Sequence, residues 1–389
     1  MKRAPVLLSA AALLALAAAA CSSNSDSDDG QATSTSGAAT ATAPSRATQA
    51  TGSPTTATTT GGQAIVLGDT IKASAGATVS GSDVTITKGG TWTISGTLKD
   101  GMVKVATKGE AIDIVLDGAA ITNGDGPALY LAEGTEATVT LQAGTKNTLA
   151  DGGTAEEDAA LYAAMPLTIK GEGDLTVHGN ANEGISSTMH ITFASGNVRV
   201  YAVEDGVNAN NDGVSIITVS GGYLYVQSET GDAIDSNGTI VINGGTVLAL
   251  GSPDKDASNG LDADGGVTIN GGAVIGTGQQ AFRIATDSKQ KGILANFGAT
   301  QKAGTLVSIQ KDGATILAIA PEAAFPNLFF SNATIADNVT YTVFTGGTAS
   351  GNSTDGVYAN TTVTGATQVT TTTTASLNTI TGPGGRPPR

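Results

Sequence analysis

A repeat of 22 to 27 residues in the middle of the chain constrains the fold more than any other feature. Four segments align, each with an apolar residue followed by a polar one, and the apolar residues are spaced 22, 27 and 27 positions apart. A repeat of this length is typical of solenoid proteins, in which each unit packs on its neighbours. The segments are Glu183-Gly-Ile-Ser-Ser187, Asp205-Gly-Val-Asn-Ala209, Asp232-Ala-Ile-Asp-Ser236 and Asn259-Gly-Leu-Asp-Ala263.

Each repeat contains three short strands separated by glycine-rich turns. In the third repeat the first segment is followed by a second strand, Ile240-Val-Ile242, a turn, Asn243-Gly-Gly245, and a third strand, Val247-Leu-Ala249. Apolar residues recur at every second position of such strands, and helix signals are absent. The pattern predicts an all-β, right-handed, single-stranded parallel β-helix of roughly eight three-strand rungs. A β-propeller, the main alternative, has blades of about 40–45 residues, which is too long for this repeat.

Composition divides the chain into five parts. Residues 1–20 combine a basic start with an apolar stretch and predict a signal peptide, whereas residues 21–62 are rich in Ser, Thr and Ala and predict a disordered tether. The β-helix is expected over 63–285. A C-terminal β cap of the same domain is expected over 286–347, because an open end would expose backbone edges. Residues 348–389 are rich in Thr, Gly and Pro and predict a flexible tail.

Cys21 directly follows the predicted signal peptide and is the only cysteine of the chain. The residues before it are typical of a lipoprotein signal, although Ala18 stands where Leu is usual. We therefore expect lipidation of Cys21 to anchor an extracytoplasmic, monomeric protein at the cell surface, with the anchor as its sole membrane contact. Ordinary secretion, with Cys21 incidental, is the alternative.

Acidic residues dominate the central part of the chain. Residues 63–347 contain 30 acidic and 14 basic side chains, a net charge of −16. So acidic a body repels nucleic acid and anionic membrane surfaces, and we expect neither as a partner. An acidic polymer would need a bound cation in order to approach it.

The repeat places polar, mostly acidic side chains in two outward columns. Equivalent residues of consecutive rungs stack about 4.8 Å apart. Carboxylates at that distance repel one another and favour a hard cation, and a set of oxygen ligands suits calcium better than zinc or copper. The alternative is that Asp and Asn serve the turns by hydrogen bonding to the backbone. The predicted calcium ligands are Asp205, Asn208, Asp232, Asp235, Asn259 and Asp262.

Further motifs carry a family resemblance. The chain contains Gly96-Thr-Leu-Lys-Asp-Gly101, Val115-Leu-Asp-Gly118, Gly144-Thr-Lys-Asn-Thr-Leu149 and Tyr341-Thr-Val-Phe-Thr-Gly-Gly347, in this order around the repeats. Together they resemble the bacterial carbohydrate-binding parallel β-helix lipoproteins over most of 63–347. The resemblance implies a pectate-lyase-like fold, bound calcium, and binding of cellulose-like or acidic polysaccharide.

Three functions are compatible with these features. The first is a cell-surface polysaccharide-binding protein with a calcium-dependent acidic face, in which Tyr223, Tyr225 and Arg283 contact sugar. The second is a pectate-lyase-like polysaccharide lyase, in which calcium acidifies a proton and Arg283, one rung beyond Asp262, removes it. The third is a structural surface protein without a sugar ligand. Because no second basic residue in clear register supports the lyase, we expect binding and assign no catalytic residue.

Overall fold

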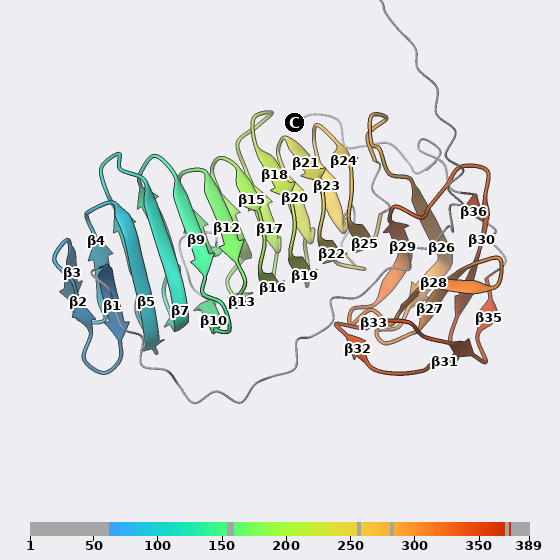
Figure 1. Cartoon of the computed structure of the whole chain (residues 1–389), viewed down its shortest axis with the longest axis horizontal. Coiled ribbons are helices and arrows are strands. Elements are labelled where there is room, and N and C mark those ends of the chain that lie inside the picture. The colour runs from blue at the N-terminus through green and yellow to red at the C-terminus, as the bar shows by residue number, and fades with distance from the viewer. Residues whose placement is uncertain (1–61, 154–158, 255–257, 281–283, 370–372, 375–389) are drawn as a thin grey trace, which may run out of the picture. The chain divides into compact units, whose positions relative to one another are not determined.

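The computed structural model describes residues 62–153, 159–254, 258–280, 284–369 and 373–374 (Figure 1). They belong to one compact unit that comprises residues 39–389. The described residues are all β, and none of them lies in a helix able to span a membrane. The predicted signal peptide, the tether up to residue 61, Cys21 and Arg283 lie outside the described residues.

A parallel β-solenoid of about eight rungs forms the main body, as the repeat predicts (Figure 1). From Leu129 onward each rung contributes one strand to each of three faces, and strands pair in register with their equivalents in neighbouring rungs; in the rungs before it, one long strand crosses both the second and the third face. The first face contains β4 (Asp83–Ile86), β6 (Val103–Ala106), β8 (Leu129–Glu133), β11 (Ala159–Ala163), β14 (Glu183–Ser187), β17 (Val207–Ala209), β20 (Ile234–Ser236) and β23 (Leu261–Ala263), with β3 (Ala77–Ser80) antiparallel at its edge.

The other two faces repeat in the same way. The second face contains β9 (Ala137–Leu141), β12 (Leu167–Gly171), β15 (Ile191–Phe193), β18 (Ile216–Val219), β21 (Thr239–Ile242) and β24 (Val267–Ile269). The third face contains β10 (Lys146–Asp151), β13 (Asp174–Gly179), β16 (Asn197–Ala202), β19 (Tyr223–Ser228), β22 (Thr246–Leu250) and β25 (Ala273–Thr277). At the N-terminal end are β1 (Gln63–Leu67), β2 (Lys72–Ala73), β5 (Gly90–Leu98) and β7 (Ile112–Asn123), the last long enough to pair with both β9 and β10.

Inward residues of the three faces form one continuous core. Ile185, Val207, Ile234 and Leu261 stack in register on the first face and are fully buried. Each such side chain contributes roughly 1.5–3 kcal/mol relative to an exposed one. The residues between them point outward and form the surface of the solenoid. This explains why apolar and polar residues alternate along each strand.

Glycine is required at the turn between the second and third faces. Gly222, Gly245 and Gly272 have φ angles of 78°, 79° and 88°. A Cβ on Gly245 would lie 2.8 Å from the carbonyl oxygen of Gly222, and a Cβ on Gly272 would lie 2.7 Å from that of Gly245. Both the backbone conformation and the spacing of the rungs therefore exclude larger side chains, which accounts for the Gly-Gly pairs of the repeat.

A C-terminal cap closes the last rung. The strand β29 (Phe325–Ser331) pairs antiparallel with both β25 and β26 (Gly292–Gln301), so it covers an edge that a further rung would otherwise occupy. The cap also contains an antiparallel hairpin of β27 (Val307–Lys311) and β28 (Ala314–Ile319), and β30 (Thr340–Thr345) pairs with β27.

The cap extends beyond the predicted boundary at residue 347. Residues 348–369, predicted to be flexible tail, form short strands, several of which pair with the cap sheet. These two-residue strands contain mostly Thr, Ser and Val, so their composition alone resembles a linker. They are β31 (Thr348–Ala349), β32 (Ser353–Thr354), β33 (Val357–Tyr358), β34 (Val363–Thr364) and β35 (Thr367–Gln368), and β36 (Thr373–Thr374) pairs with β30 farther on.

The cap also buries two residues that were predicted to contact sugar. Tyr223 and Tyr225 point outward from the third face, as expected, but they are only 7% and 0% exposed. They pack with Leu248 and Ile275 of the solenoid against cap residues such as Phe330. Because the cap occupies this surface, the prediction that these tyrosines stack on a carbohydrate is wrong.

Candidate functional site

The first predicted column of polar residues is present on the first face. Ser186 of β14 pairs in register with Asn208 of β17, Asn208 with Asp235 of β20, and Asp235 with Asp262 of β23. The apolar residue before each of these points into the core, so all four side chains point outward, as the repeat predicts.

The second column lies three residues earlier in each repeat. Backbone amides of Gly184, Gly206 and Ala233 donate hydrogen bonds of 3.0 to 3.1 Å to the carbonyl oxygens of Asp205, Asp232 and Asn259, respectively. These bonds align the column residues rung by rung. The two columns together are called the acidic ladder here, and its members are Glu183, Ser186, Asp205, Asn208, Asp232, Asp235, Asn259 and Asp262.

Some acidic side chains also serve the backbone. Asp205 Oδ1 accepts a hydrogen bond of 2.7 Å from the backbone amide of Asp232, and Asp232 Oδ1 accepts one from the backbone amide of Asn259. The interpretation of these residues as turn-stabilising is therefore correct for one oxygen of each carboxylate. It does not account for the gathering of several carboxylates in one place.

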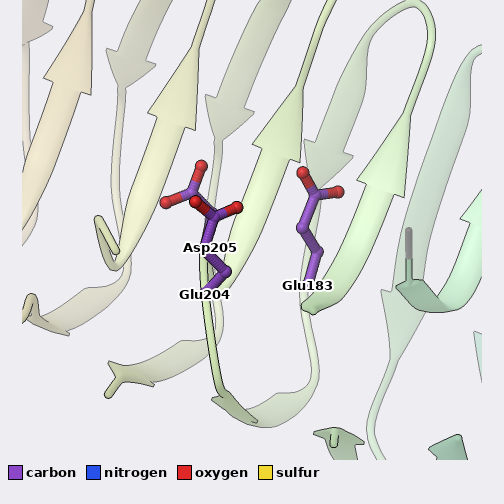
Figure 2. Close-up of side chains that lie close together, drawn as sticks. All are labelled: Glu183, Glu204 and Asp205. Carbon is purple, nitrogen blue, oxygen red and sulfur yellow. The ribbon is translucent and has the colours of Figure 1, made fainter. Parts of the chain in front are cut away.

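Carboxylate oxygens gather at two positions along the acidic ladder. Asp232, Asp235 and Asp262 each place one oxygen within 4.8 Å of the others. Glu183, Glu204 and Asp205 form a second cluster with the same property, in which Glu204 and Asp205 lie beside each other on one rung and Glu183 on the next (Figure 2). Glu204 was not predicted because it lies outside the repeat register, although it forms a Glu-Asp pair with Asp205 just before β17 in the sequence.

Burial and mutual repulsion raise the pKa of two carboxyl groups in the first cluster. Burial first, and then the charges of Asp205 and Asp262, raise the pKa of Asp232 to about 9. The same causes, with the charge of Asp264 added, raise the pKa of Asp235 to about 8. The ladder therefore resists holding all its negative charge unless a cation compensates for it.

Two buried oxygens of the first column have no hydrogen-bond partner. Ser186 Oγ is fully buried, and Asn208 is 9% exposed, with its Oδ1 unpartnered. The amide nitrogen of the same Asn208 side chain donates a hydrogen bond of 2.5 Å to Glu183 Oε1. A buried oxygen without a donor is costly, whereas a cation beside Glu183 would use it as a ligand. Carboxylate, amide and hydroxyl oxygens are the donors that calcium prefers, so the residues present fit that ion.

The structure does not test the predicted role of Arg283. The residue lies outside the described part of the chain, and the next described residue, Ile284, forms a parallel bridge to Val267 on the second face. The roles of Arg283 as a lyase base or as a sugar contact stay predictions.

The chain is similar to proteins that are already known. A carbohydrate-binding domain-containing protein from Acetivibrio thermocellus is 37% identical over 137 residues, which cover 33% of this chain and 48% of that protein. This chain thus spans about half the length of that relative. A solved structure of the polysaccharide lyase-like protein from C. thermocellum, a gadolinium derivative, is 29% identical with a TM-score of 0.48 and covers 55% of this chain and 89% of the other. Residues 80–376 match the family model described as carbohydrate-binding domain-containing protein, so the chain belongs to that family.

Proposed function

We propose that the protein binds an acidic polysaccharide through calcium held on the acidic ladder. The observation that carries this proposal is the combination of crowded carboxylates with the buried, unpartnered oxygens of Ser186 and Asn208. Family membership supports carbohydrate as the ligand. The ladder supports calcium as the link, because a body with a net charge of −16 over residues 63–347 repels a polyanion directly.

Each cluster would hold its own calcium ion. Asp232, Asp235 and Asp262 would hold one calcium ion, and Glu183 with Glu204 and Asp205 would hold another. When bound, calcium neutralises the carboxylates and offers coordination positions to oxygens of the sugar. The chain itself aligns the ligands, because the stacked rungs set the spacing of both columns.

We propose an acidic ligand over a neutral one for the acidic ladder. On the third face, stacking of neutral sugars on Tyr223 and Tyr225 is excluded by their burial under the cap. A uronate carboxylate, in contrast, is a natural ligand for a calcium ion that is already bound to the ladder. Binding of cellulose-like polymers is thus the less favoured outcome, and it is included in the test.

Co-sedimentation tests the proposal directly. The purified protein is mixed with a polyuronate gel or with insoluble cellulose, in calcium or in EGTA, and the supernatant is also followed for the ultraviolet absorbance of unsaturated sugar ends. Retention on the polyuronate that requires calcium, without new absorbance, is expected. Retention that EGTA does not change would overturn the calcium link, and rising absorbance would instead identify a lyase.

We also infer that lipid on Cys21 holds the protein at the outer side of a cell membrane. The basic and apolar stretch that precedes Cys21 supports this localisation. Detergent phase partitioning of the protein from cells, compared with a Cys21→Ser variant, tests it. The native protein is expected in the detergent phase and the variant in the aqueous phase; equal partitioning would contradict the anchor.

A further inference from the structure

The outward column of the acidic ladder continues toward the N-terminal end with residues of a different kind. Tyr162 of β11 pairs in register with Ser186 of β14, Tyr130 of β8 with Tyr162, and Lys104 of β6 with Tyr130. One uninterrupted column on seven neighbouring strands therefore reads Lys104, Tyr130, Tyr162, Ser186, Asn208, Asp235 and Asp262.

The three added residues contact one another. The rings of Tyr130 and Tyr162 pack edge to face, with centroids 5.6 Å apart and planes at 77°. The ammonium nitrogen of Lys104 lies 4.8 Å from the centre of the Tyr130 ring, within the range of a cation–π interaction. These contacts hold each side chain in one arrangement, which lowers the entropy that a ligand would otherwise cost on binding.

These side chains remain accessible, in contrast to the tyrosines beneath the cap. Lys104, Tyr130 and Tyr162 are each half-buried, whereas Tyr225 is fully buried. The second column also changes from acidic to apolar here, because Ala159 pairs in register with Glu183. The first face thus passes from an acidic half to a half that presents aromatic rings and an ammonium group beside a small apolar neighbour.

Rings and an ammonium group in this arrangement match a uronic acid chemically. The apolar face of a sugar ring packs on an aromatic side chain such as that of tyrosine. The ammonium group of Lys104 attracts a sugar carboxylate without needing calcium. Because rungs repeat about every 4.8 Å, a polymer lying along the column would meet one contact residue after another.

We propose that Lys104, Tyr130 and Tyr162 form a sugar-binding subsite that continues the acidic ladder, so that one acidic polysaccharide chain crosses both. The inference rests on the proposed function, to which it adds the direction of the bound polymer and a part that needs no calcium. The polymer runs along the first face from strand to strand, with its carboxylates meeting Lys104 at one end and the bound cations at the other.

Replacing both rings tests the subsite. In Tyr130→Thr/Tyr162→Thr the strands keep β-branched residues, so the fold is expected to survive; Tyr358→Thr, which changes a half-buried tyrosine in the cap, is the matched control. Binding of the purified protein to polyuronate is measured in calcium and in EGTA, and calcium binding is measured by calorimetry without sugar. We expect polyuronate binding about fivefold to tenfold weaker in the double variant, with calcium binding and the control unchanged.

The outcomes separate this inference from the proposed function. Calcium-dependent binding that is equally tight in the double variant overturns the subsite and leaves the calcium link intact. If EGTA does not change the binding of polyuronate but the double variant binds it more weakly, the calcium link is overturned and the subsite is supported. If the wild type binds no polyuronate at all, both are overturned.

Lys104 and the tyrosines can be distinguished by a second pair of variants. Lys104→Gln is expected to weaken binding of a uronic acid oligomer severalfold and to leave that of the corresponding neutral oligomer unchanged, since it removes a charge and not a ring. Tyr130→Phe/Tyr162→Phe keeps the rings, and we expect it to restore most of the binding lost in the Thr variant. Loss of binding in the Phe variant equal to that in the Thr variant would overturn the role of the rings.

Discussion

Arg199 on the third face of the solenoid and Asp355 in the cap form an ion pair, with Nη2 and Oδ2 2.8 Å apart. The two residues are 156 positions apart in the sequence. The same Oδ2 accepts a hydrogen bond of 2.7 Å from the hydroxyl of Tyr223. One carboxylate thus ties a late segment of the chain to two rungs of the solenoid, which explains why the outward tyrosines are closed off from solvent.

Removal of this carboxylate is expected to destabilise the protein. Asp355→Asn breaks the ion pair and leaves the Arg199 guanidinium partly buried beside Tyr223; for a pair that is partly exposed, we expect a loss of about 1–2 kcal/mol in the free energy of unfolding. Urea unfolding measures it. Asp312→Asn, an exposed cap residue in a hairpin turn, is the matched control and should change little. Equal stability of the two variants would contradict a structural role for the Arg199–Asp355 pair.

Without calcium, the protein should become less stable as the pH rises. The folded-state pKa of Asp232 (about 9) and of Asp235 (about 8) lie above the ordinary value of 3.8, so the folded state binds more protons than the unfolded state between these limits. Stability from these groups is therefore fully present below about pH 4 and is lost as the pH rises toward about 9. Unfolding free energies in EGTA at pH 5 and pH 9 measure the loss.

Bound calcium and substitution of the ladder carboxylates should each reduce the dependence of stability on pH. Bound calcium compensates for the charge of the ladder, so the difference between pH 5 and pH 9 is expected to shrink when calcium is present. Asp232→Asn/Asp235→Asn removes both titrating groups and should shrink the difference in EGTA as well. Burial also raises the pKa of Asp151, so part of the dependence should remain in that variant. An unchanged dependence in the double variant would show that it originates elsewhere.

The two carboxylate clusters should bind calcium as separate sites. Calorimetry of the wild type is expected to show two ions per chain if both clusters are occupied. Asp262→Asn weakens the first cluster and Glu204→Gln the second, because each variant replaces a charged ligand with a neutral one. Each variant should therefore lose one binding event and keep the other. Loss of both events in either variant would indicate one shared site.

The sequence was sufficient for features that depend on the repeat. Asn208, Asp235 and Asp262 were predicted to stack because their spacing repeats with the rungs, and the structure confirms their register. The positions of Tyr130 and Tyr162 in this column were not predicted, because the earlier repeats differ in length and give no clear alignment with Ser186. Only backbone pairing shows that they share its column.

Whether an outward side chain is exposed to solvent was harder to predict than the direction in which it points. The alternation of β19 correctly indicated that Tyr223 and Tyr225 point outward, yet whether an outward residue meets solvent depends on what packs over it. Here the covering residues come from the cap, and they include Asp355, whose Oδ2 accepts a hydrogen bond from the Tyr223 hydroxyl. The chain around Asp355 is short of apolar residues, so nothing in its local composition indicated that it packs against the solenoid.

The stacking of glycines at the rung turns leads to a last prediction. Gly245 and Gly313 both have a φ of 79°, but a Cβ on Gly313, in the cap hairpin, would meet no atom within 4 Å. Gly313→Ala therefore measures the conformational cost alone, about 1–2 kcal/mol. Gly245→Ala adds a clash with the backbone of the rung before it, which neighbouring rungs on both sides prevent from moving, so its loss of unfolding free energy should be clearly larger. Equal losses in urea unfolding would show that the rungs can separate locally, and that the column spacing on which the acidic ladder depends is not rigid.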